Sequence, residues 1–115
     1  SGEPSVGTLH FHIYDSGASD PADANVHSLD LSAVVPVGTK AVLGFITAAS
    51  GTAGDYVIVT DSGGTATYGI ARVTSTSVSS DGFFFSPLTS DRLIYYQANN
   101  SRVTSQRFRI VAYCI

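Results

Sequence analysis

The chain has 115 residues, of which 43% are hydrophobic and 13% charged, so it suits one domain with one core and not a disordered tail. Six Lys and Arg against nine Asp and Glu give a net charge of −3, without the basic surplus of a nucleic-acid-binding protein. The single Cys114 excludes an internal disulfide, and no apolar run approaches the roughly 20 residues that cross a bilayer. We expect residues 1–7 to be a linker or cloning scar and residues 8–115 to be one domain.

Short runs of alternating apolar residues recur between Gly, Asp, Ser, Asn and Pro, which is typical of antiparallel β proteins. This spacing predicts an all-β fold, an antiparallel β-sandwich of jelly-roll type with about eight strands and no membrane insertion. In chain order, the expected strands cover residues 8–14, 26–31, 40–48, 55–60, 66–73, a segment around 83–85, 91–98 and 106–115.

Two of these strands and the stretch after residue 73 allow more specific expectations. Residues 26–31 alternate as a strand does and also fit a helical face; we favour the strand. Residues 40–48 are apolar on both faces, so this strand is expected to be central or covered. Residues 74–80 either extend the preceding strand as an exposed edge or form a loop.

Catalytic patterns are weak. No G-x-S-x-G sequence is present, and all three histidines lie in the first quarter of the chain, so a serine hydrolase triad is not favoured. Most Asp residues stand beside Gly, Ser or Pro, where their carboxylates commonly cap turns. We therefore predict that the protein is not an enzyme and keep a small hydrolase as a distant alternative.

His10 and His12 form the sharpest local pattern, because residues two apart on a strand share a face and can converge on one metal ion. Either His27 or a threefold axis would have to complete such a site, and two solvated histidines are the simpler interpretation. The loop 15–25 is rich in the oxygen ligands that calcium prefers, but it does not have EF-hand spacing, so a surface loop is favoured. No other cofactor is expected.

The last expected strand has an unusual face. Its natural core stripe comprises Phe108, Ile110, Ala112 and Cys114. The opposite stripe is half basic and half apolar, and comprises Arg107, Arg109, Val111, Tyr113 and Ile115. Such a face suits a subunit interface or a sugar-binding surface as well as it suits an ordinary exterior.

For a ligand, we predict stacking on Tyr14 and Tyr96, with their neighbours Ile13 and Tyr95 left to the core. The candidate binding loops are residues 15–25 and 99–105, which can meet if the first and last strands pair. The polar ligand-binding candidates in or beside these loops are Asp20, Asp23, Asn99, Asn100 and Arg102.

Residues 29–43 (LDLSAVVPVGTKAVL) and 54–59 (GDYVIV) resemble small jelly-roll modules of bacteriophage tail fibres. The resemblance implies a non-catalytic receptor-binding or structural module of a virion, assembled as a homotrimer and bound to a host-surface glycan or protein. His10 and His12 also look like the pairs with which some fibre tips hold iron on a threefold axis. The rival interpretation is a carbohydrate-binding module or lectin of a secreted bacterial protein, with an extracellular location.

Overall fold

The computed structural model describes residues 9–15 and 23–115, the first of these ranges by its backbone alone. Its regular structure consists of antiparallel strands, and no helix occurs in the part of the chain that is described, so none there could cross a membrane. In chain order, the strands are β1 (Leu9–Asp15), β2 (His27–Asp30), β3 (Ala41–Ser50), β4 (Tyr56–Thr60), β5 (Thr67–Arg72), β6 (Ser80–Pro87), β7 (Leu93–Ala98) and β8 (Val103–Cys114). The predicted all-β fold with about eight strands is confirmed.

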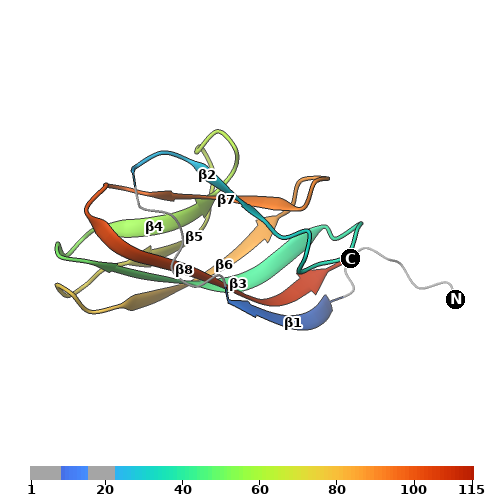
Figure 1. Cartoon of the computed structure of the whole chain (residues 1–115), viewed down its shortest axis with the longest axis horizontal. Coiled ribbons are helices and arrows are strands. Elements are labelled where there is room, and N and C mark those ends of the chain that lie inside the picture. The colour runs from blue at the N-terminus through green and yellow to red at the C-terminus, as the bar shows by residue number, and fades with distance from the viewer. Residues whose placement is uncertain (1–8, 16–22) are drawn as a thin grey trace, which may run out of the picture.

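The strands share one hydrogen-bonded order, β1-β8-β3-β6-β5-β4-β7-β2, which curls into two facing layers (Figure 1). β1, β8, β3 and β6 form the first layer, and β5, β4, β7 and β2 form the second. Except from β4 to β5, each strand passes to the other layer, which gives the strand order of an eight-stranded jelly roll. The first and last strands pair, as expected, with Leu9 opposite Cys114.

The core lies between the layers and is built from the inward-facing residues of both. Its largest fully buried hydrophobic side chains are Phe84, Phe108, Leu31, Ile46, Ile94 and Ile110. Burying one such ring or branched chain is worth about 2–3 kcal/mol relative to leaving it exposed, so this alternating set dominates the stability of the sandwich.

The structure shows how residues 26–31, 40–48 and 74–80 fold. β2 confirms the strand over residues 26–31, and a single turn follows it, closed by bonds from the amides of Val34 and Val35 to the carbonyl of Leu31. β3 is central, since β8 pairs on one side and β6 on the other. Most of residues 74–80 form a loop, and β6 begins only at Ser80.

The predicted faces of the last strand are correct in its middle and wrong at its end. Phe108, Ile110 and Ala112 are fully buried, but Cys114 is only half-buried and Tyr113 packs against the core. The register shifts where β8 passes Leu43 and Gly44 of β3, which inserts one extra residue into β8. The bulge breaks the alternation, so that Tyr113, opposite Val42, turns towards the core next to the buried Ala112, and one stripe of inward-facing residues does not run through the whole strand.

Candidate functional site

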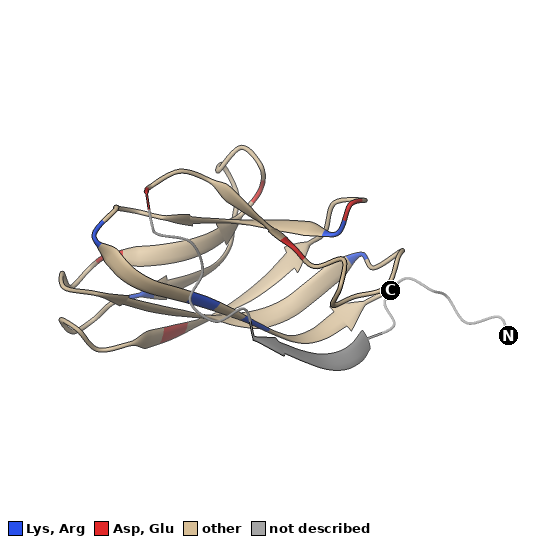
Figure 2. Cartoon of the chain, in the orientation of Figure 1, with Lys and Arg blue, Asp and Glu red and all other residues tan. Residues whose placement is uncertain are grey.

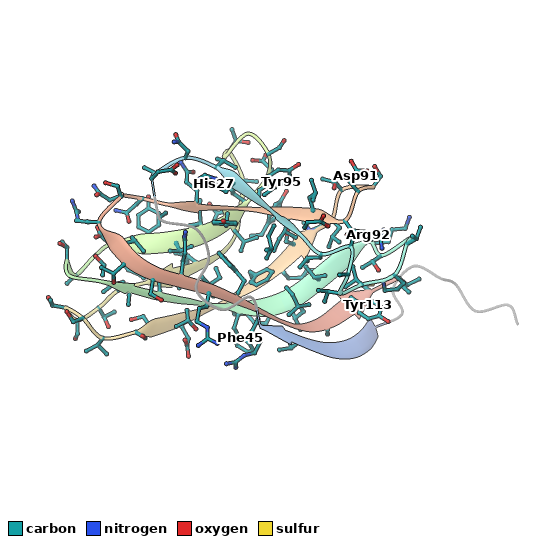
Figure 3. All side chains as sticks on the ribbon, in the orientation of Figure 1. His27, Phe45, Asp91, Arg92, Tyr95 and Tyr113 are labelled. Carbon is teal, nitrogen blue, oxygen red and sulfur yellow. The ribbon has the colours of Figure 1, made fainter. Side chains whose placement is uncertain are left out.

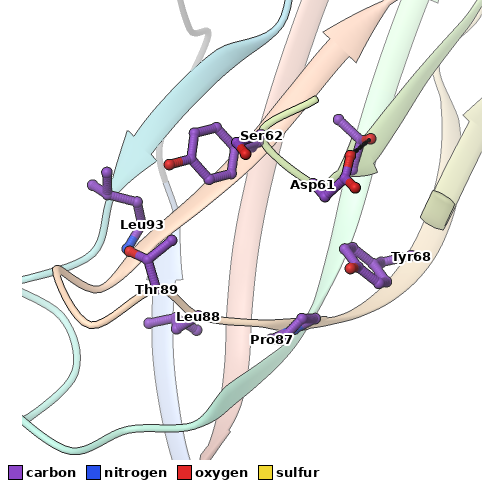
Figure 4. Close-up of a pocket in the computed structure, with 9 residues that line it drawn as sticks. Asp61, Ser62, Tyr68, Pro87, Leu88, Thr89 and Leu93 are labelled. Atoms are coloured by element: carbon purple, nitrogen blue, oxygen red, sulfur yellow. Dashed lines mark hydrogen bonds between the residues drawn. The ribbon is translucent and has the colours of Figure 1, made fainter. Parts of the chain in front are cut away.

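A pocket of about 180 Å³ opens at the end of the sandwich where β4 and β6 finish and β5 and β7 begin (Figure 4). Strand ends from both layers meet here, so the walls come from segments far apart in the sequence. The lining residues are Thr60, Asp61 and Ser62 of the β4–β5 connection, Tyr68 of β5, Pro87, Leu88 and Thr89 at the end of β6, and Leu93 and Tyr95 of β7.

Two tyrosine rings supply the aromatic surface of this pocket. Tyr68 and Tyr95 are both half-buried. Tyr68 packs with part of its ring against the core, whereas Tyr95 alternates on β7 with Ile94 and Tyr96, which turn into the core. Tyr95 of β7 lies opposite Thr60 of β4 in the register, and both residues line the pocket. Neither tyrosine hydroxyl has a hydrogen-bond partner among the described residues, so both can bond to a ligand.

Asp61 is the carboxylate of the pocket wall, and it also fixes the β4–β5 turn. The Thr65 hydroxyl donates to its Oδ2 at 2.7 Å, and the Thr65 amide donates to its Oδ1 at 2.8 Å. These hydrogen bonds, that from the Thr65 side chain above all, lower the pKa of Asp61 to about 2. The pocket therefore carries a fixed negative charge at neutral pH, with lone pairs that can accept from ligand hydroxyls.

The β6–β7 loop forms the opposite wall and is held in shape by its own contacts. Thr89 accepts the Leu93 amide on its hydroxyl at 3.1 Å and the Arg92 amide on its carbonyl at 2.9 Å. Arg92 in turn donates to the carbonyls of Ser32 and Val35, both at 3.0 Å. The wall is thus preorganised, which lowers the entropy cost of binding a ligand.

A second hollow lies beside this pocket and shares Leu88 and Thr89 with it. Its other walls come from residues 37–40 and Ser90, and it holds the only lysine of the sequence, Lys40. Asp61 thus lines the first hollow and Lys40 lines the second.

The sequence-based choice between two adjacent tyrosines is wrong. Tyr96, predicted to be an exposed stacking ring, is only 3% exposed and packs with its centroid 4.7 Å from that of Phe108. Tyr95, which the sequence assigns to the core, lines the pocket with Tyr68. Figure 3 labels its side chain. The side chain of Tyr14 and the whole of Asp20 lie outside the described residues.

Three further candidates, Asn99, Asn100 and Arg102, lie at the opposite end of the sandwich and surround a buried carboxylate. Arg102 holds Asp55 through two hydrogen bonds of 2.8 Å, and Asn99 donates to it at 3.1 Å. The Ser50 hydroxyl donates to the same carboxylate at 2.7 Å. Arg102 foremost, these bonds lower the pKa of Asp55 to about 2.

This second cluster has a clear structural task. Asn99 also accepts the amide of Tyr56 at 2.7 Å, and Asn100 accepts the amide of Arg102 at 3.0 Å, so the cluster ties the β7–β8 turn to the start of β4. It is not brought together with the pocket. The ligand-binding role predicted for Asn99, Asn100 and Arg102 stays a prediction.

The metal prediction is likewise untested. His10 and His12 lie on β1, whose side chains are outside the described part of the chain. His27, the proposed third ligand, instead contacts Asp23 at 2.7 Å, which pairs one predicted ligand-binding residue with one predicted metal ligand. No group of three or more His, Cys, Asp or Glu suitable for a metal ion occurs within residues 23–115.

Comparisons with known proteins give no family. No family model matches the chain, and no curated protein matches it. Two solved structures have a similar fold. The carbohydrate-binding module CBM6cm-2 of Cellvibrio mixtus lichenase 5A, in complex with cellotriose, is 12% identical, with a TM-score of 0.45 over 96% of this chain and 92% of that one. A β-1,3-glucan-binding CBM6 from Bacillus halodurans is 13% identical, with a TM-score of 0.45 over 96% of this chain and 89% of that one.

These comparisons correct the resemblance drawn from the sequence. The similar structures are carbohydrate-binding modules, so the interpretation as a phage tail-fibre module of a virion is wrong. Residues 35–43 (VPVGTKAVL), which are part of the stretch that carries the resemblance, form a turn and the first three residues of the central strand β3. No enzyme family was found, and the comparisons do not support a trimer.

Proposed function

We propose that this chain is a non-catalytic carbohydrate-binding module of an extracellular protein, with the pocket at Tyr68 and Tyr95 as its saccharide site. The observation that carries the proposal is the pairing of two half-buried tyrosine rings, whose hydroxyls have no partner among the described residues, with an ionised carboxylate. A sugar ring presents apolar C–H faces and a rim of hydroxyls, which match aromatic faces and a few fixed polar groups.

The composition of the pocket favours binding without turnover. Glycoside hydrolysis requires two carboxyl groups roughly 5–10 Å apart, one of them holding a proton at working pH. Asp61 is the single carboxylate among the residues that line the pocket, and its pKa is lowered, so it is a poor proton donor. Ser62 and Thr89 add hydroxyls that suit hydrogen bonding to a saccharide, whereas the buried Thr60 hydroxyl already donates to the carbonyl of Ala66.

Isothermal titration with cellotriose and with a soluble β-1,3-glucan tests the proposal, because these are the ligand types named for the two similar modules. Tyr95→Ala and Tyr68→Ala should each weaken binding by about 1–3 kcal/mol, the range of a lost interface aromatic. That loss corresponds to about 5–150-fold in Kd.

Tyr56→Ala is the matched control. Tyr56 is a half-buried tyrosine at the start of β4, under the guanidinium of Arg72 at 4.9 Å, whereas the pocket lies at the other end of that strand. It should bind like the unsubstituted protein. The proposal fails if no saccharide in a broad glycan panel binds, or if Tyr56→Ala lowers affinity while Tyr68→Ala and Tyr95→Ala do not.

A further inference from the structure

Three phenylalanines stand exposed on the outer face of the first layer, away from the proposed saccharide pocket. Phe45 of β3 is 39% exposed, and Phe83 and Phe85 of β6 are 54% and 50% exposed. The register places Phe83 beside Phe45 and Phe85 beside Leu43, and the first two rings meet edge to face at 6.0 Å. We call Phe45, Phe83 and Phe85 the phenylalanine platform (Figure 3 labels Phe45).

The platform is a sizeable apolar patch. Three rings of this exposure present on the order of 300 Å² of apolar surface, comparable with the largest patch on a typical soluble monomer, which is often functional. The alternation of β3 and β6 does not require it, because Ser or Thr at these outward positions would satisfy the same strands. The rings are therefore a candidate contact surface.

The charges that flank the platform indicate which partner fits. In the β8-β3-β6 register, Arg107, Thr47 and Asp81 form one row across the sheet, and Arg109, Phe45 and Phe83 form the next. Asp81 is held in its row by the Thr47 hydroxyl at 2.8 Å. Figure 2 shows the basic residues of β8 and an acidic residue of β6 on either side of β3. Across these three strands the face is thus basic on β8, acidic on β6 at Asp81 and aromatic between them, and β1 lies beyond β8 with Asp15 opposite Arg109 in the register.

We propose that a second copy of this chain covers the phenylalanine platform, in a face-to-face dimer whose twofold axis runs parallel to β3. This rotation sets β8 of one copy against β6 of the other and keeps each cross-strand row opposite the same row of the second copy. Arg107 of one copy then lies opposite Asp81 of the other, and Arg109 lies over the ring of Phe83, where a guanidinium is attracted to an aromatic face. Phe45 meets its own counterpart on the axis.

The mass in solution is the first test. Sedimentation equilibrium at micromolar concentrations should report twice the chain mass of 12.0 kDa, and the dimer should weaken as salt is added. Phe83→Ser should shift the mass to the monomer while the far-ultraviolet circular dichroism stays that of a β protein. A single species of 12.0 kDa across the whole concentration range would overturn the proposal.

A charge exchange tests the twofold arrangement itself. Asp81→Arg sets two arginines opposite each other and Arg107→Asp sets two aspartates opposite each other, so each variant alone should be monomeric. Mixed in equal amounts, the two variants should form a heterodimer, because every contact then pairs an arginine with an aspartate. Asp91→Arg, which changes an exposed charge on the β6–β7 loop, is the matched control and should remain a dimer.

The remaining outcomes also decide the proposal. If both charge variants stay dimeric, the interface is elsewhere. If the protein is monomeric and Phe83→Ser abolishes retention on an insoluble glucan, the platform binds polysaccharide instead of a second copy. None of these results depends on Tyr68 or Tyr95, so the proposed saccharide pocket and the dimer can fail separately.

Discussion

Gly69 of β5 lies directly opposite Phe84 of β6, and this pair is the register contact through which the two layers of the sandwich join. A side chain at Gly69 would meet the carbonyl of Phe83 and the Cα and Cβ of Phe84. The close approach lets the sheet curl from one layer into the other, and the fully buried Phe84 ring lies over Gly44 of β3.

Gly69→Ala should therefore destabilise the fold by about 3 kcal/mol, the upper part of the range for overpacking, since the obstructing atoms are mostly backbone. The free energy of unfolding in urea is the measurement. Gly51→Ala is the control, because the space around Gly51 is open, and it should change stability by less than about 0.5 kcal/mol. Equal effects at the two sites would show that the junction is not the tight point of the fold.

Stability should fall in acid because of Asp55. Its pKa is about 2 in the folded protein against an ordinary value of 3.8, so the ionised form is favoured by folding. The stabilisation that its hydrogen bonds provide is complete above pH 3.8 and is lost as the pH falls towards 2.

Asp55→Asn isolates this contribution. The variant should be less stable than the unsubstituted protein at neutral pH, and the difference between their urea midpoints should shrink as the pH is lowered from about 4 to about 2. Asp91→Asn, at an exposed loop position without a described hydrogen bond, should leave the acid dependence unchanged. A difference for Asp55→Asn that stays constant over this window would contradict the assignment.

Tyr96 and Tyr95 should respond oppositely to truncation. Tyr96→Ala removes a core ring beside Phe108 and should cost about 3–5 kcal/mol of folding free energy. Tyr95→Ala should cost nearer to about 1 kcal/mol, because its ring is half exposed, and should act mainly on saccharide binding. Thermal unfolding and titration of both variants separate the two roles, and the reverse pattern would invert the face assignment of β7.

Replacing the pocket tyrosines by phenylalanine divides stacking from hydrogen bonding. Tyr68→Phe and Tyr95→Phe keep the rings and should each weaken saccharide binding by about 0.5–1.5 kcal/mol, less than the alanine variants. Titration with the same saccharide gives both numbers. Phenylalanine variants that bind as poorly as the alanine variants would show that the hydroxyls, and not the ring faces, hold the sugar.

The sequence by itself determined the strands of this protein, because each apolar alternation ends at Gly, Asp, Asn or Pro and burial requires a period of two. It also identified β3 as central, from apolar residues on both of its faces. At Tyr95 and Tyr96, however, alternation shows only that the rings point in opposite directions. The side on which the second layer packs decides which of them is core, and that choice is made by tertiary structure.

The remaining differences have the same origin. The bulge opposite Leu43 and Gly44 turns Tyr113 towards the core. The extra residue of a bulge is defined by the pairing with β3, so the sequence of β8 by itself does not reveal it. From the sequence, Asp55 is one turn aspartate among several. Its partner Arg102 lies 47 positions further along the chain, and only the fold brings the two side chains into contact. The pocket is assembled from the ends of β4, β5, β6 and β7, so its tyrosines become a site only when the layers close and bring those ends together.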